Sequence, residues 1–186
     1  MTEVVTPAIS ASTTMRDLLL NCPGVQRALF AKYHIGGCRS CAFQPDETLG
    51  ELCARNDNLP VDEVIAHIRE SHDDDERILV EPPELKVQID SETPPKLVDI
   101  RTREEFETVK LRGALLFGQD LINEIFNSWD REESIVVYDH AGDRSLDAAA
   151  YLAGHGFGKV RCLRGGIDAY SQEADSSLSR YRIELD

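Results

Sequence analysis

The chain has 186 residues, of which 41% are hydrophobic, enough for one large domain or two small ones with buried cores. Its 20 Lys and Arg against 34 Asp and Glu give a net charge of −14, which excludes nucleic acids and anionic membranes as principal partners. There is no apolar run of about 18 residues, and Met1-Thr2-Glu3 lacks the positive flank of a signal peptide, so we expect a cytoplasmic protein. Five cysteines, an odd number, favour free, redox-active or metal-binding thiols over a disulfide framework.

Four short helices are predicted in residues 13–70, after a flexible N-terminus at residues 1–12. Apolar residues recur there at helical spacing. The expected helix boundaries are a cap at Ser12 or Thr13, a stop at Pro23-Gly24, a stop at Gly36-Gly37, starts at Asp46 or Thr48, and a start at Pro60. Residues 71–77 are strongly acidic, and like charges extend a chain, so we expect them to form a linker.

Residues 78–182 change to an alternation of strands and helices. Strands are predicted at residues 96–100, 114–117, 135–138 and 160–163, and helices from Pro82 and at residues 103–106, 120–129 and 146–154. Such alternation is typical of a parallel sheet covered by helices on both faces. The predicted fold class is therefore α/β, preceded by a small all-α domain.

The most informative segment is residues 139–145, which join the predicted strand 135–138 to the following helix. Backbone N–H groups converge where a strand turns into a helix, and they form a site for an anion. A thiol at the first position of this loop would be activated there as a thiolate. The chain has Asp139 at that position, and a carboxylate cannot carry sulfur.

Several motifs in order make residues 78–182 resemble a rhodanese domain. They are Leu97-Val98-Asp99-Ile100-Arg101, Glu105-Phe106-Glu107, Gly113-Ala114, the loop Gly142-x-Arg144-Ser145, and Leu163-x-Gly165-Gly166-Ile167-x-Ala169-Tyr170. The last of these is expected to be a closing strand and a glycine turn. The resemblance implies a small α/β fold with a parallel sheet. It also implies that family members that transfer sulfur hold it as a persulfide on a cysteine at the position of Asp139.

This chain departs from the family pattern at the loop and at residues 109–112, where the family usually has Gly-His-Ile-Pro. Asp139 and Asp143 bring negative charge to a site for thiosulfate, with Arg144 opposing them, so sulfurtransferase turnover at this loop is not expected. We interpret Asp139 as a carboxylate that fills the anion site, ahead of the alternative that it is a nucleophile. The resemblance assigns binding roles to one set of loop residues and structural roles to another: Asp139, His140, Gly142, Arg144 and Ser145 for binding, and Asp99, Arg101, Gly165 and Gly166 for structure.

A second resemblance covers residues 13–70. The run Tyr33-His34-Ile35-Gly36-Gly37-Cys38-Arg39-Ser40-Cys41, followed by Glu47-Thr48-Leu49 and Val61-Asp62-Glu63-Val64-Ile65, resembles the helical redox disulfide family associated with hybrid-cluster proteins. Members carry a CxxC pair after a glycine-rich turn. The resemblance implies a role in redox chemistry or sulfur handling, and it assigns that role to Cys38 and Cys41.

The spacing of Cys38 and Cys41 supports the same role, because two cysteines so placed can close a reducible disulfide and a nearby cation such as Arg39 lowers a thiol pKa. An unreactive pair in a tight turn is the alternative. No cofactor is expected. A weaker alternative is a zinc or iron–sulfur site made by His34, Cys38, Cys41 and Cys53, although Cys53 lies on an apolar stripe with Leu49 and Leu52.

The resulting hypothesis is a two-domain protein of redox or sulfur metabolism. A helical domain with Cys38 and Cys41 relays sulfur or cycles between dithiol and disulfide, and an inactive rhodanese-like domain binds a small anion or another protein of that metabolism. Two alternatives remain. In one, neither domain reacts and the chain is a protein-interaction module; in the other, it is an active sulfurtransferase that carries persulfide on Cys38.

Overall fold

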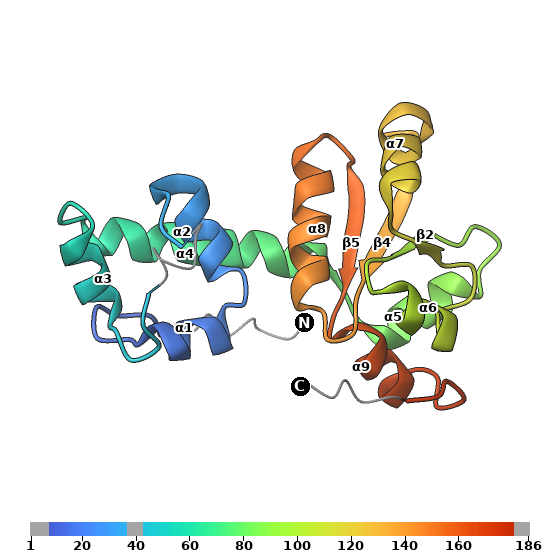
Figure 1. Ribbon diagram of the computed structural model, residues 1–186, viewed down its shortest axis with the longest axis horizontal. Helices are drawn as coiled ribbons and strands as arrows, with labels where there is room; N and C mark the ends of the chain where they lie inside the picture. The colour runs from blue at the N-terminus through green and yellow to red at the C-terminus, as the bar shows by residue number, and fades with distance from the viewer. Residues whose placement is uncertain (1–7, 37–42, 181–186) are drawn as a thin grey trace. The chain divides into compact units, whose positions relative to one another are not determined.

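The computed structural model of the chain describes residues 8–36 and 43–180, and it divides into two compact units, Met1–Arg77 and Ile78–Asp186. Figure 1 shows the N-terminal unit in blue to green and the C-terminal unit in green to red. Among the described helices, none is both long and apolar enough to cross a membrane. The predicted reactive pair, Cys38 and Cys41, lies outside the described residues.

The N-terminal unit is helical, with α1 at Met15–Asn21, α2 at Val25–Tyr33, α3 at Leu49–Arg55 and the beginning of α4, which spans Val61–Ile78. The Thr14 side chain caps α1 by accepting from the N–H of Asp17. Thr48 and Glu51 form a capping box at the start of α3. The buried face of these helices forms one hydrophobic core, which includes Met15, Leu18, Leu29, Leu49, Leu52, Val64 and Ile68.

The acidic segment 71–77, which we predicted to be a linker, is instead helical and belongs to α4. The prediction was wrong because two acidic side chains of this segment form ion pairs with arginine side chains. Asp75 is only 6% exposed and forms an ion pair with Arg27 of α2, and Asp74 is paired with Arg77 at 2.5 Å. These ion pairs reduce the repulsion that would otherwise extend the chain.

The C-terminal unit contains a parallel five-stranded sheet with the order β1-β5-β4-β2-β3, which confirms the predicted fold class. The strands are β1 at Leu79–Val80, β2 at Lys96–Asp99, β3 at Leu115–Leu116, β4 at Ser134–Tyr138 and β5 at Lys159–Leu163. The helices are α5 at Pro82–Ile89, α6 at Arg103–Thr108, α7 at Gln119–Ser128, α8 at Asp143–Gly154 and α9 at Gly166–Glu173. We did not predict β1, and we expected only a turn where α9 begins.

Side chains of the central strands alternate between two cores, one on each face of the sheet. On one face, Ile135 and Val137 pack with residues of α7 and α8. On the other, Val136 and Tyr138 pack with residues of α5 and α9. This burial on both faces explains why β4 reads as a continuous apolar run. β4 ends at Tyr138, and the loop at residues 139–145 begins directly after it.

Candidate functional site

The loop at residues 139–145 starts at the carboxyl end of β4, between the neighbouring strands β5 and β2, and leads directly into α8. Ligand sites of parallel α/β sheets lie at the carboxyl ends of the strands. Gly142 is the N-cap of α8 with φ of +95°, a backbone conformation that favours glycine. The sheet and the helix thus place the N-terminal N–H groups of α8 around the side chain that follows Tyr138.

That side chain is the carboxylate of Asp139, which is 5% exposed. It accepts hydrogen bonds from the backbone N–H groups of Gly142, of Arg144 at 2.9 Å and of Ser145 at 3.3 Å. The Ser145 hydroxyl donates a fourth, also at 3.3 Å. A carboxylate at a helix N-terminus is stabilised both by these donors and by the helix dipole. Asp139 therefore supplies the acceptor for the N-terminal N–H groups of α8 and uses the donors that an anion would need.

The charges next to Asp139 do not favour a second anion in the loop. Burial raises the pKa of Asp143, and the negative charges of Asp139 and Asp147 raise it further. The side chain of Arg144, which the sequence suggested as the opposing cation, is exposed to solvent, and its contact with Asp139 is made through the backbone. The immediate surroundings of the loop are thus acidic.

The other side of the loop packs closely against two consecutive glycines, Gly165 and Gly166. The carbonyl oxygens of Asp139 and His140 accept hydrogen bonds from the N–H groups of Ile167 and Asp168, at the start of α9. Both Gly165 and Gly166 have positive φ, and a Cβ on Gly166 would lie 2.4 Å from the His140 carbonyl oxygen. These predicted structural residues therefore lie in contact with the predicted binding loop, and only glycine permits the approach.

Asp99 and Arg101, also predicted to be structural, lie at the end of β2 and form a buried ion pair with an Nη2 to Oδ2 distance of 2.6 Å. Arg101 also donates to the Val109 carbonyl oxygen at 2.7 Å. Burial, followed by the charge of Asp99, raises the pKa of Tyr138 well above its usual range. The Tyr138 hydroxyl accepts from the Leu111 N–H at 3.3 Å. The ion pair thus helps to hold the segment before β3 against the sheet.

The structure adds one residue that the sequence placed only in the core. The Cys162 sulfur, on β5, lies 3.3 Å from the Ser145 hydroxyl oxygen. The thiol is fully buried, as are those of Cys22 and Cys53 at 2% and 1% exposure. No sequence motif connects Cys162 with the loop, because their proximity follows from the pairing of β4 with β5. Without exposure, none of these three thiols is placed to meet a substrate.

The metal alternative involves two described residues, His34 and Cys53. His34 is the exposed C-cap of α2, and Cys53 lies in the hydrophobic core of the N-terminal unit. Within residues 8–36 and 43–180, there is no group of three or more His, Cys, Asp or Glu that could hold a metal ion. The other two predicted ligands, Cys38 and Cys41, are outside those ranges.

Comparison with known proteins agrees with this geometry. The rhodanese-like domain family matches residues 81–173, which make up half of the chain. A protein named sulfurtransferase from Allochromatium vinosum is 38% identical over 76 residues, covering 41% of this chain and 71% of that protein. A thiosulfate sulfurtransferase GlpE from Ectopseudomonas mendocina is 31% identical over 74 residues, covering 40% of this chain and 68% of that protein.

Among solved structures, a rhodanese-like domain protein from Staphylococcus aureus is similar at 27% identity with a TM-score of 0.46, covering 56% of this chain and 98% of that one. The matched family segment contains β2 through α9, and hence the loop, the buried ion pair and the glycine pair described above. The chain belongs to the rhodanese-like domain family.

Proposed function

We propose that this protein handles sulfur through thiols outside the 139–145 loop, and that its rhodanese-like domain binds a partner or small anion without forming a persulfide. A role in sulfur handling is supported by relatives that are named sulfurtransferases. The proposal that the rhodanese-like domain forms no persulfide is supported by one observation. The Asp139 carboxylate accepts hydrogen bonds from the backbone N–H groups of Gly142, Arg144 and Ser145.

Sulfur transfer needs a nucleophilic thiolate, and in this proposal Asp139 occupies the position of the family's thiol. The electrostatics of the loop support the same conclusion. The N–H groups that would stabilise an incoming anion are already hydrogen-bonded to a carboxylate, and Asp143 adds a second negative charge nearby. An external anion would have to displace the internal one and overcome this repulsion.

The reactive thiols in this proposal are Cys38 and Cys41, since the other three cysteines are buried in hydrophobic cores. The Cys38 thiolate would attack the outer sulfur of a donor persulfide. A bond forms between the two sulfurs, the S–S bond of the donor breaks, and the donor leaves as a thiolate. The product is a persulfide on Cys38, and the reaction needs no further oxidant or reductant. We also propose that the donor is another protein of sulfur or redox metabolism.

Peptide mass spectrometry of the full-length chain, digested after incubation with glutathione persulfide, tests this assignment. Peptides from the wild-type chain should carry one added sulfur atom on Cys38 or Cys41. The double variant Cys38→Ser, Cys41→Ser should carry none, whereas Cys53→Ser, which leaves the pair intact, should still be labelled. Persulfide on the double variant, or none on the wild type, would contradict the proposal.

A further inference from the structure

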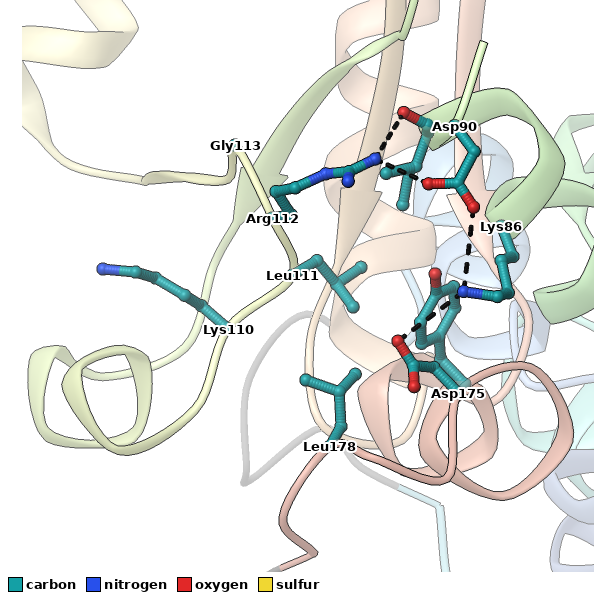
Figure 2. A pocket seen from close by; sticks show the side chains of 10 residues that line it. Lys86, Asp90, Lys110, Leu111, Arg112, Gly113, Asp175 and Leu178 are labelled. Atoms are coloured by element: carbon teal, nitrogen blue, oxygen red, sulfur yellow. Dashed lines mark hydrogen bonds and ion pairs between the residues drawn. The ribbon is translucent and has the colours of Figure 1, made fainter.

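The C-terminal unit also contains a pocket that is separate from the 139–145 loop. It is open to solvent, has a volume of about 480 Å³ and is lined by three segments: the end of α5, residues 110–113, and α9 with the turn that follows it (Figure 2). No residue of the 139–145 loop lines it. Its volume is within the range of about 300–1,000 Å³ that is usual for small-molecule sites.

Apolar side chains form much of the pocket wall. Leu111, Ile89 and Tyr170 line it and are 1%, 8% and 3% exposed, and Leu178 lines it from the turn after α9. The first three belong to the core on the α5 and α9 face of the sheet, so their positions are fixed by packing. This wall offers a ligand a preformed apolar surface.

The Tyr170 hydroxyl is a further polar group at the pocket. Although the residue is only 3% exposed, its hydroxyl is not one of the fully buried oxygen atoms, and no hydrogen bond within the described residues engages it. Burial raises the Tyr170 pKa, and the charges of Asp175 and Asp90 raise it further. The hydroxyl therefore keeps its proton and is available as a donor.

The charged groups at the pocket are partly satisfied by one another, as Figure 2 shows. Arg112 binds the Asp90 carboxylate at 2.6 Å and the Ile89 carbonyl at 3.0 Å, both through Nη2. The Lys86 Nζ lies 3.7 Å from Asp90 and 3.7 Å from Asp175, which is longer than a hydrogen bond. Asp175 already accepts two hydrogen bonds from Ser177, at 3.1 and 2.6 Å.

Most of the groups at the pocket that can still form hydrogen bonds are therefore donors. Lys86 makes no short hydrogen bond within the described residues, Tyr170 has an unused hydroxyl, and Arg112 uses one of its three guanidinium nitrogens. Lys110, at the edge of the pocket, has its ammonium 4.2 Å from the ring centroid of Phe106. Three cations against two carboxylates give this pocket a local charge opposite to the net charge of −14.

We propose that this pocket binds a small organic anion with a carboxylate or similar oxyanion head and a hydrophobic body. The head would accept from the Tyr170 hydroxyl and the Lys86 ammonium, and the body would pack on Ile89, Leu111 and Leu178. A cationic ligand fits less well, because it would have to compete with Lys86 and Arg112 for Asp90 and Asp175. This proposal does not rest on the state of the 139–145 loop or on Cys38 and Cys41.

Amide NMR titration of the full chain with hexanoate, hexanol and hexylamine separates the contributions of head and body. Hexanoate should cause saturable shifts confined to α5, residues 110–113 and residues 170–178. Its dissociation constant should be at least about tenfold lower than those of hexanol and hexylamine, because a charge-assisted hydrogen bond is stronger than a neutral one. Equal affinity for all three, or shifts elsewhere, would contradict the proposal.

Two variants test the assigned donors. Tyr170→Phe keeps the ring but removes the hydroxyl, so it should weaken hexanoate binding about fivefold and leave hexanol binding unchanged. Lys86→Met should weaken hexanoate binding by a similar factor, whereas the same change at Lys159, an exposed lysine outside the pocket, should have no effect. If Tyr170→Phe alters the amide spectrum globally, Lys86→Met decides. Unchanged hexanoate affinity in a folded Lys86→Met variant would overturn the proposal.

Discussion

The backbone N–H of Arg144 donates a hydrogen bond of 2.9 Å to the carboxylate of Asp139. This contact links the end of β4 to the first turn of α8. It is one of four hydrogen bonds that the buried Asp139 carboxylate accepts. An anion site at a helix N-terminus is therefore satisfied from within the chain. In the proposed function, the same carboxylate both stabilises the loop and keeps an external anion from binding there.

The first prediction concerns this internal carboxylate. Asp139→Ala would leave buried N–H groups of α8 without their acceptor, and it should lower the free energy of unfolding by about 1–3 kcal/mol. Urea denaturation followed by the near-ultraviolet signal of Trp129, which is 7% exposed in the same unit, measures the change. Glu92→Ala, at an exposed position in the same unit, is the matched control and should change stability little. Equal effects of the two substitutions would show that Asp139 does not stabilise the loop.

The second prediction concerns the approach of the loop to α9. A Cβ on Gly166 would lie 2.4 Å from the His140 carbonyl oxygen, and φ there is +61°. Gly166→Ala should therefore cost about 2–5 kcal/mol, from a backbone clash in addition to strain. Gly156 has a φ of +90° with open space around its Cβ position, so Gly156→Ala should cost only about 1–2 kcal/mol. Thermal unfolding of both variants compares them directly, and a larger loss at Gly156 would contradict the packing described here.

The third prediction concerns the buried ion pair at the end of β2. Arg101→Met would remove the cation beside the fully buried Asp99 carboxylate and should cost about 3–5 kcal/mol. Arg103 provides the control, because its pair with Glu107 is exposed and longer at 3.9 Å. Arg103→Met should cost less than about 1 kcal/mol. Denaturant titration distinguishes the two, and similar small losses would mean that Asp99 does not depend on Arg101.

The sequence was sufficient to predict most of the alternating strands and helices of the C-terminal unit, because β4 is a continuous apolar run and β2 and β5 contain the short apolar pairs Leu97-Val98 and Cys162-Leu163. It did not reveal β1, whose two residues are too few for a periodic signal. The helical state of residues 71–77 was also missed, since it depends on the contact between Asp75 and Arg27, 48 positions apart. Local charge counts cannot show such a contact.

The same difference between local patterns and distant contacts applies to the candidate sites. The loop was recognised because its residues are close in sequence. The pocket that contains Lys86 and Tyr170 was not recognised, because three separate segments assemble it and none carries a motif. The proximity of Cys162 to Ser145 likewise follows from the pairing of β4 with β5 and the packing of α8 against them.

The fourth prediction concerns pH. Burial raises the pKa of the Cys22 thiol, and the charges of Asp75 and Glu76 raise it further. The native state therefore holds the protonated thiol, while the thiol of the unfolded chain has a pKa of about 8.5. The resulting contribution to stability is complete below that pH and is lost as the pH rises toward the native pKa. Urea unfolding at about pH 7 and pH 9.5 should show a smaller loss of stability for Cys22→Ala than for the wild type. An unchanged pH dependence in Cys22→Ala would show that this thiol is not protonated preferentially by folding.

The most direct test of the central claim is the rate of thiocyanate formation from thiosulfate and cyanide by the full-length double variant Cys38→Ser, Cys41→Ser. This variant keeps the 139–145 loop, Asp139 and the buried Cys162. Our account predicts a rate equal to the uncatalysed background. Catalysed turnover by this variant would show that the rhodanese-like domain transfers sulfur with Asp139 in place, which contradicts the account.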